Sequence, residues 1–472
     1  MSDPSARFPL EPSSDELRSL LSEATDYVVR HLESIADQPS HDVAQSERIA
    51  ASLHESRAPE EARSFGELLD LLFDTAIPAS MNSASGGYMA YVPGGGIVHS
   101  AVADFIADAV NRYVGLRIGA PALVELEANT IRWFCDFVGY PEGAGGILTS
   151  GGSLANFSAI VTAREARSLD TPLERVTVYV SDQAHHSVRK ASVLAGVPAA
   201  NVRELSTDNE FRIDCACLED AIATDRTCGM VPIAIVANAG TTNSGAIDDL
   251  HELADLCRRH SVWLHVDAAY GGFFALTERG AQKLSGLEQA DSITLDPHKG
   301  LFLPYGTGSL LVKDPAKLYC AHSFSADYVS SSDHTIDFGQ MSPEQTRDFR
   351  GLRVWLPLKM LGVAPFREAL DEKLDLAEWL ARELRQVDNV EVMFQGLSTV
   401  LFRARGNDES GSALDELNQK FLVEINAQQR CYLSGTRIRG AYALRACILC
   451  FRTHQEHVEA CLDAIRVALK RL

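Results

Sequence analysis

The amino-acid sequence predicts an α/β protein with a mostly parallel central sheet, a smaller α+β domain after it and a helical arm before it. Three observations support this fold class. β-rich runs alternate with helical segments in the middle of the chain, strand-like runs gather again after a long helical pattern, and the first residues are helical and amphipathic. With 472 residues and 46% apolar content, the chain can fill one large core and a second, smaller one.

Each part of this prediction rests on a stretch of the chain. We expect a helical arm over residues 1–85, a large domain over 86–360 and a small domain over 361–472. The strands of the large sheet are expected in "VTVYVSD", "PIAIVANAG", "VWLHVDAAY", "SITLDPH" and "TGSLLVKD". The helical pattern "FREALDEKLDLAEWLARELRQV" then leads to the strand-like runs "VEVMFQG", "STVLFRA" and "YALRACILCF" of the small domain.

Charge and hydropathy exclude several function classes. The 43 Lys and Arg residues against 64 Asp and Glu residues give a net charge of −21, the wrong sign for binding nucleic acid or an anionic membrane surface. No apolar run approaches the ~20 residues that span a bilayer, and the first residues lack the order of a signal peptide. We therefore expect a cytoplasmic protein that acts on a small molecule and has no membrane or nucleic-acid partner.

The ten cysteines are scattered along the chain, which suits reduced thiols better than a disulfide framework. Cys447 and Cys450 form a C-x-x-C, but they lie in an apolar strand-like run with no second pair and no histidine cluster nearby. We interpret both as core residues and predict no metal site.

Four polar motifs follow strand-like runs, at the edge where open α/β sheets bind ligands. In "TSGGS", Gly152 and Ser153 open a helix and can offer free N–H groups to a phosphate, although Gly-Gly before a helix is most often only a turn. "DQAHHS" carries two adjacent histidines, of which His185 is the first. Asp267 ends "WLHVD", where a buried carboxylate needs a cationic partner. Lys299 ends "DPHK", where desolvation can make it a nucleophilic amine, although a lone lysine also caps turns.

One cofactor uses all four groups, since it needs a phosphate cradle, a carboxylate for a protonated pyridine nitrogen, a stacking side chain and a Schiff-base lysine. That cofactor is pyridoxal 5'-phosphate (PLP). Together with "GGYMAYVPGGG", "LVELEANTIRWFCDFVGYP" and "YALRACILCFRTHQEHVE", these motifs make the chain resemble the PLP-dependent group II amino-acid decarboxylases, which include the aromatic-L-amino-acid and glutamate decarboxylases. The resemblance implies the PLP-dependent transferase fold, fold type I, as in aspartate aminotransferase.

The resemblance also implies roles for the matching residues. Lys299 would bind PLP as a Schiff base, Asp267 would face the pyridine nitrogen, and His185 would stack on the ring. The other cofactor-binding positions are Gly152, Ser153, Thr242, Ala269 and His298. Asp296 stands where several relatives carry asparagine, and a carboxylate so close to a phosphate is expected to repel it.

For the reaction, the resemblance implies decarboxylation of an L-amino acid to an amine and CO2 through a quinonoid intermediate, which makes the chain a carboxy-lyase. The serine-rich stretch 322–345 is longer than an ordinary connection and is expected to form a catalytic lid. Tyr328 in this stretch matches the residue that returns a proton to Cα, although a tyrosine on a surface loop is the simpler interpretation without the resemblance.

The sequence leaves the substrate open between an aromatic and an acidic amino acid. Relatives build part of the pocket from the neighbouring subunit, which predicts a homodimer with the active site at the interface and points to Tyr91, Pro93 and Gly94. Arg117 could read a second acidic group of the substrate by paired hydrogen bonds, or could face outward as a structural arginine.

Other activities would use the same cofactor residues. An aminotransferase retains the α-carboxylate, usually on an arginine of the small domain, for which Arg445 and Arg452 are candidates. A decarboxylating aldehyde synthase would differ mainly at the loop tyrosine. A non-catalytic paralogue would be expected to have lost Lys299 or Asp267, and both are present.

Overall fold

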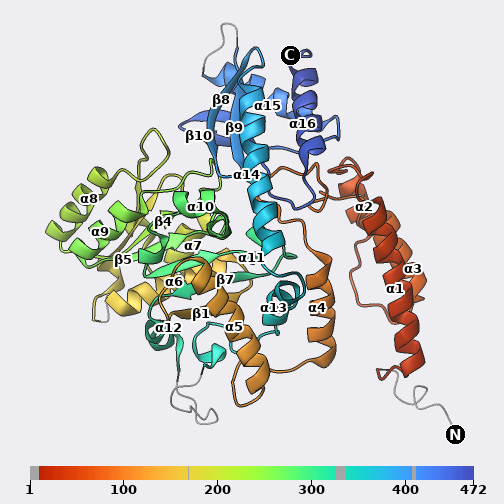
Figure 1. Cartoon of the computed structure of the whole chain (residues 1–472), viewed down its shortest axis with the longest axis horizontal. Helices are drawn as coiled ribbons and strands as arrows, with labels where there is room; N and C mark the ends of the chain where they lie inside the picture. The colour runs from red at the N-terminus through yellow and green to blue at the C-terminus, as the bar shows by residue number, and fades with distance from the viewer. Residues whose placement is uncertain (1–9, 168–169, 325–335, 407–410) are drawn as a thin grey trace.

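Two separate sheets organise the computed structural model of the chain, which describes residues 10–167, 170–324, 336–406 and 411–472 (Figure 1). The larger sheet has seven strands and lies in the middle of the chain, whereas the smaller sheet has four strands and belongs to the C-terminal part. The strands of the larger sheet are β1 (Gly145–Thr149), β2 (Val176–Ser181), β3 (Val202–Leu205), β4 (Val231–Asn238), β5 (Trp263–Asp267), β6 (Ser292–Leu295) and β7 (Gly308–Val312).

The order of the large sheet brings several strand ends to one edge. Its order is β1-β7-β6-β5-β4-β2-β3, and only β7 runs against its two neighbours. The carboxyl ends of β1, β2, β4, β5 and β6 therefore lie at the same edge, and the predicted mostly parallel sheet is confirmed. The runs predicted as strands contain β2, β4, β5, β6 and β7.

Helices cover both faces of this sheet. Successive residues of each strand point to opposite faces and therefore belong to different hydrophobic cores. In β4, Ile235 and Ala237 belong to one core, whereas Ala234 and Val236 belong to the other. The covering helices are α4 (Val98–Val110), α5 (Pro121–Phe137), α6 (Gly152–Arg167), α7 (His186–Leu194), α8 (Cys215–Thr227), α9 (Leu250–His260), α10 (Glu278–Lys283), α11 (Pro297–Gly300), α12 (Pro315–His322) and α13 (Gly351–Leu361).

Helix α6 lies especially close to the sheet. Ala155, Ala159 and Ala163 repeat every four residues, so they share one face of the helix, and all three are fully buried. Small side chains on that face let the helix approach the strands closely. This approach places the start of α6, at Gly152, beside the edge where the parallel strands end.

The small domain packs an antiparallel sheet against long helices. Its strands are β8 (Val390–Gly396), β9 (Thr399–Ala404), β10 (Ser434–Ile438) and β11 (Ala441–Cys447), in the order β10-β11-β9-β8, and its helices are α14 (Ala364–Leu384), α15 (Ser412–Asn426) and α16 (Gln455–Leu469). Sequence reasoning did not predict β3 and β10. Both are edge strands in which only one residue is buried, and neither forms an apolar run. The C-x-x-C thiols of Cys447 and Cys450 are buried in this part of the fold.

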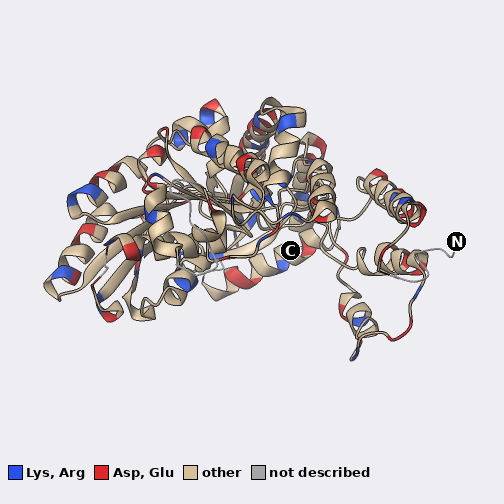
Figure 2. Cartoon of the chain, turned by 90° about the horizontal axis from the view of Figure 1, so that it is seen from below, with Lys and Arg blue, Asp and Glu red and all other residues tan. Residues whose placement is uncertain are grey.

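The N-terminal arm consists of helices that stand apart from the two sheets (Figures 1 and 2). They are α1 (Ser14–Ser34), α2 (Ser46–Ser52), α3 (Phe65–Asp70) and a π-helical continuation, η2 (Leu71–Ala76). The Tyr27 hydroxyl donates a hydrogen bond to Asp70, which ties α1 to α3. No residue of α1 is buried. The proposed boundary between the large and small domains falls where α13 ends, and no described helix is long and apolar enough to cross a membrane.

Candidate active site

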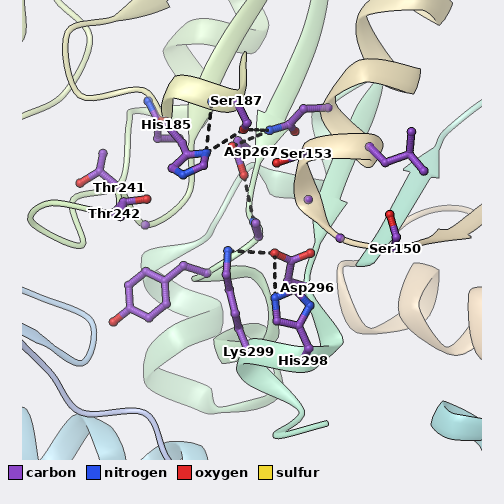
Figure 3. Close-up of a pocket in the computed structure, with 18 residues that line it drawn as sticks. Ser150, Ser153, His185, Ser187, Thr241, Thr242, Asp267, Asp296, His298 and Lys299 are labelled. Atoms are coloured by element: carbon purple, nitrogen blue, oxygen red, sulfur yellow. Dashed lines mark hydrogen bonds and ion pairs between the residues drawn. The ribbon is translucent and has the colours of Figure 1, made fainter. Parts of the chain in front are cut away.

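A cavity of about 300 Å³ opens where the parallel strands end (Figure 3). Polar side chains from β5, α6, α7 and α11 point into it, together with residues of the loop after β4. All eight positions predicted to bind the cofactor line this cavity: Gly152, Ser153, His185, Thr242, Asp267, Ala269, His298 and Lys299. The fold therefore brings together residues that lie far apart in the sequence.

Lys299 lines the cavity and forms an ion pair with Asp296. Its Nζ lies 2.8 Å from Oδ2 of Asp296, which precedes the short helix α11 (Figure 3). Burial lowers the pKa of Lys299, but the charge of Asp296, the hydrogen bond to it and the charge of Asp267 outweigh burial and raise the pKa above its usual value. The other oxygen of Asp296, Oδ1, is buried and has no hydrogen-bond partner among the described residues.

His298 lies beside the same carboxylate, with Nε2 at 3.7 Å from Oδ2 of Asp296. Its Nδ1 donates to the backbone oxygen of Thr307 at 2.6 Å, so Nδ1 carries the proton and Nε2 is the free nitrogen. Burial lowers the pKa of His298, which favours the neutral ring. This part of the cavity therefore holds one cation and one anion in direct contact, with a neutral imidazole beside them.

Asp267 ends β5 and is 8% exposed. Its Oδ2 accepts a hydrogen bond from Nδ2 of Asn156 at 2.9 Å, and its Oδ1 accepts one from the backbone N–H of Ala269 at 3.2 Å. No cationic side chain in the described part of the chain forms an ion pair with Asp267. Hydrogen bonds instead stabilise the buried charge, and the carboxylate keeps capacity to accept from a protonated nitrogen in the cavity.

His185 presents a neutral imidazole to the cavity. The residue caps α7, and its Nδ1 accepts from the backbone N–H of Ser187 at 3.3 Å and lies 2.7 Å from the Ser187 hydroxyl. Because Nδ1 accepts, the ring proton sits on Nε2. Burial lowers the pKa of His185, and the ring of His186 stands 4.1 Å away, centre to centre.

The start of α6 forms a cradle that suits a phosphate. A Cβ added to Gly152 would lie 3.0 Å from Oδ2 of Asp296 and 3.2 Å from the Cβ of Ala269, so any larger residue would fill this space. The first turn of a helix has N–H groups without intrahelical acceptors, and its dipole favours an anion. The cradle, the lysine, the carboxylate and the imidazole together match the groups that PLP requires.

Several polar residues that sequence reasoning missed also line the cavity, namely Asn156, Ser187, Asn238, Thr241 and Tyr270, together with Ser150 of the predicted "TSGGS" motif. Asn156 was detectable in principle, because it lies one helical turn after Gly152 among small and apolar residues of α6, where a polar side chain is unusual. The others depend on loop geometry that the sequence does not reveal.

The residues predicted to contact the substrate lie outside this cavity. Gly94 lies against the backbone of His298, since a Cβ added to Gly94 would lie 2.1 Å from the backbone oxygen of His298. Pro93, the preceding residue, is buried. Tyr91 is 57% exposed. Arg117 is one-third exposed and donates from Nη1 to Oε2 of Glu125 at 2.9 Å. Tyr328 lies outside the described residues.

Arg445 and Arg452, the small-domain arginines, differ in their contacts. Arg452 donates from Nη1 to the backbone oxygens of Ala84 and Gly95. Arg445 is buried and donates from Nη1 to the backbone oxygen of Tyr91 at 2.6 Å, but its Nε and Nη2 have no partner among the described residues. Unpartnered buried N–H groups are unfavourable, so Arg445 has donors available for an anion.

Comparison with known proteins connects this site to a family. The conserved domain of pyridoxal-dependent decarboxylases matches residues 48–405. The aromatic-L-amino-acid decarboxylase of Bacillus atrophaeus is 35% identical over 95% of this chain and 94% of its own length. The phenylacetaldehyde synthase of Arabidopsis thaliana is 27% identical over 94% of each chain. The crystal structure of Oryza sativa TDC with PLP and tryptamine superposes with a TM-score of 0.92 at 26% identity, over 98% of this chain and 99% of that one. These similarities confirm the predicted fold type and the PLP cofactor.

Proposed function

The chain belongs to the pyridoxal-dependent decarboxylases, which are PLP-dependent carboxy-lyases, and from this premise we propose that it converts an aromatic L-amino acid to its amine and CO2. The aromatic substrate is supported by similarity to an aromatic-L-amino-acid decarboxylase and to a TDC structure that contains tryptamine. The observation that carries the proposal is the convergence of Lys299, Asp267 and His185 on one cavity beside the α6 cradle (Figure 3).

Bound PLP supplies a ring that withdraws the electron pair left when the carboxylate departs. In our proposal Lys299 holds the cofactor through Nζ and releases it to the substrate amine. Asp267 keeps a proton on the facing ring nitrogen, because a buried carboxylate with two neutral donors favours a cationic neighbour. His185 would cover a face of the ring with a neutral imidazole, and Ala269, on the loop after β5, would contact the ring as well.

The phosphate is assigned to the start of α6, where Gly152 leaves room and Ser153 belongs to the first turn. His298 and Thr242 complete the proposed cofactor contacts, since both line the same cavity. Asp296 lies at this end as well. Its pairing with Lys299 partly neutralises the carboxylate, which lowers the repulsion of a phosphate that the sequence predicted.

A general acid is needed to protonate Cα after the carboxylate has left. We assign this role to Tyr328, which lies outside the described residues. The buried guanidinium of Arg445 keeps two donors that have no partner among the described residues, but Arg445 does not line this cavity, so we assign it no part in holding the carboxylate that leaves.

We further propose that the protein is a cytoplasmic homodimer with the substrate side of the site at the interface. The exposed face of α4 carries Val98, Val102, Phe105 and Ile106, which are 40% to 50% exposed and share one side of the helix. Such an apolar stripe beside an arm whose longest helix, α1, has no buried residue suits a second copy of the chain. Phe105→Asp should then yield monomers by light scattering and weaken substrate binding, whereas a wild-type monomer at assay concentration would contradict the proposal.

The substrate proposal is tested by measuring CO2 release from each common L-amino acid under identical conditions. Tryptophan, tyrosine, phenylalanine or dihydroxyphenylalanine should be the best substrate, with amine and CO2 in equal amounts. Preference for glutamate or aspartate would contradict the aromatic assignment but keep the decarboxylase assignment.

A decarboxylating aldehyde synthase is the second candidate, because a phenylacetaldehyde synthase is among the relatives. Such an enzyme consumes oxygen and releases aldehyde, ammonia and peroxide. The relatives reported above lend no support to an aminotransferase, which would release a keto acid. Product analysis of one reaction separates all three activities.

A further inference from the structure

A buried hydrogen-bond network lies behind Asp267 and centres on Asn156 of α6. Asn156 is 1% exposed, and His265, two residues before Asp267 on β5, is fully buried. The Asn156 amide contacts side chains from β5, β6 and α7. Its four partners are Asp267 (2.9 Å), Ser187 (3.2 Å), His265 (3.0 Å) and Thr294 (2.7 Å).

Chemistry fixes the direction of every bond in this network. A carboxylate only accepts, so Nδ2 of Asn156 must face Asp267, and Oδ1 must then accept from Nε2 of His265 and from the Thr294 hydroxyl. With its proton on Nε2, His265 accepts at Nδ1 from the Ser292 hydroxyl at 2.8 Å, and that hydroxyl accepts from Nε1 of Trp263 at 2.8 Å.

The amide of Asn156 thus uses its whole capacity, two donors and two acceptors. The second donor reaches the Ser187 hydroxyl, which is then oriented to donate to Nδ1 of His185 at 2.7 Å. One amide therefore touches Asp267 directly and sets the tautomer of His185 through Ser187. Both of these residues face the cavity.

We propose that Asn156 is a positioning residue that holds the Asp267 carboxylate toward the cofactor ring nitrogen and fixes the His185 ring with its proton on Nε2, with His265 acting as the neutral support of Asn156. The inference rests on the proposed function, because it gives Asp267 and His185 their cofactor contacts. It concerns only residues of this chain and requires no group beyond PLP.

The neutral state of His265 follows from its surroundings. Burial lowers its pKa to about 4 and outweighs the charge of Asp267 and a backbone hydrogen bond with Ser292, which both raise it. A protonated His265 could still donate to Asn156 through Nε2, but its Nδ1 would no longer accept from Ser292, and that serine already accepts from Trp263. The low pKa therefore favours the neutral ring, in which Nδ1 accepts from the Ser292 hydroxyl.

Asn156→Leu tests the proposal, because leucine has a similar size and removes all four hydrogen bonds. The measurements are the affinity of the cofactor-free protein for PLP, followed by tryptophan fluorescence, and the nuclear magnetic resonance shift of ring-nitrogen-labelled PLP. We expect about 10- to 100-fold weaker PLP binding, the scale of a lost hydrogen bond to a charged group, and a shift toward the unprotonated ring nitrogen.

Ser158→Ala is the matched control, because Ser158 lies on the same helix, is fully buried and has a hydroxyl without a hydrogen-bond partner in the described structure. It should leave both measurements unchanged. A second pair keeps the test decisive if Asn156→Leu does not fold. His265→Gln retains a neutral donor and should preserve the nitrogen shift, whereas His265→Leu should lose part of it.

Unchanged PLP affinity and nitrogen shift in a folded Asn156→Leu protein would overturn the positioning role. The same result in both His265 variants would overturn the supporting role of His265. Failure of the wild-type protein to bind PLP would instead contradict the proposed function itself, so the two failures are distinguishable.

Discussion

The cofactor side and the substrate side of the cleft are built differently. On the cofactor side, Asp267, His185 and Lys299 follow strand ends, are largely buried and have hydrogen-bond or ion-pair partners within the chain. On the substrate side, Tyr91 is 57% exposed and Arg117 pairs with a surface glutamate. The carboxyl ends of parallel strands lie at one edge of the sheet, so residues of a single chain can form the whole cofactor site there. The proposed substrate residues lie on loops, with Tyr91 exposed and Pro93 and Gly94 buried, and in our proposal a second chain completes this side.

The largest expected effect comes from the cofactor side. Lys299→Ala should abolish turnover, because no other amine in the described cavity can hold PLP covalently. Borohydride reduction followed by mass spectrometry should find PLP attached to a peptide in the wild type and not in the variant. Lys313→Ala, at the end of the neighbouring strand β7, is the control and should keep both attachment and activity. Full activity of Lys299→Ala would break the assignment of the cofactor side.

Tyr328→Phe should change the product rather than stop the reaction. The variant keeps the aromatic ring but cannot donate a proton to Cα, so oxygen should intercept the electron-rich carbon. Amine should fall, and aldehyde, ammonia and peroxide should rise, as measured by product analysis with oxygen uptake. Tyr319→Phe on α12 is the control for loss of a nearby phenol. A Tyr328→Phe enzyme that makes amine at the wild-type rate would show that the proton comes from elsewhere.

Asp296→Asn should shift the pH dependence of cofactor loading. The raised pKa of Lys299 keeps it protonated in the cofactor-free protein, and only the neutral amine can attack PLP, so the rate of attachment should rise with pH. Removing the charge of Asp296 should lower the pKa of Lys299. The same attachment rate should then be reached about 1 to 3 pH units lower, the usual effect of one adjacent opposite charge. Stopped-flow absorbance measures the rate, with Asp314→Asn at the exposed cap of α12 as control.

The ion pair between Lys299 and Asp296 also makes the stability of the protein depend on pH. Because the folded pKa of Lys299 lies above the unfolded value of ~10.4, the pair stabilises the cofactor-free protein fully below that pH, and its contribution disappears as pH rises through the folded pKa. In Asp296→Asn, the free energy of unfolding should no longer show this decrease at alkaline pH. If the rate of PLP attachment had the same pH dependence in the wild type and in Asp296→Asn, Asp296 would not control the pKa of Lys299.

The smallest effect is expected at Arg117 on the substrate side. Exposed ion pairs such as Arg117–Glu125 contribute ~0 to 1 kcal/mol, so Arg117→Ala should change kcat/KM for an aromatic substrate by less than about fivefold. Glu125→Gln should behave alike. A loss of ~2 kcal/mol in Arg117→Ala alone would show that this guanidinium binds a substrate anion and would sharpen the interface assignment.

Much of the fold was predictable because the strands of a buried parallel sheet are continuous apolar runs. "SITLDPH" contains β6, and "VTVYVSD" contains β2. The edge strands β3 and β10 were missed, since each buries only one residue and no apolar run marks them. Cofactor positions such as Lys299 and Asp267 were predictable because each follows a strand of the same sheet.

By itself, the sequence determined the layered α/β architecture, the cofactor chemistry and eight of the residues that line the cavity, because strand periodicity and strand-end motifs are local. Tertiary structure alone decided which of these residues touch. It paired Lys299 with Asp296, placed Asn156 between Asp267 and His185, turned Arg117 toward Glu125 and left two donors of Arg445 without partners. The direction of a side chain and the donors around it depend on neighbours distant in sequence, and no local pattern encodes that distance.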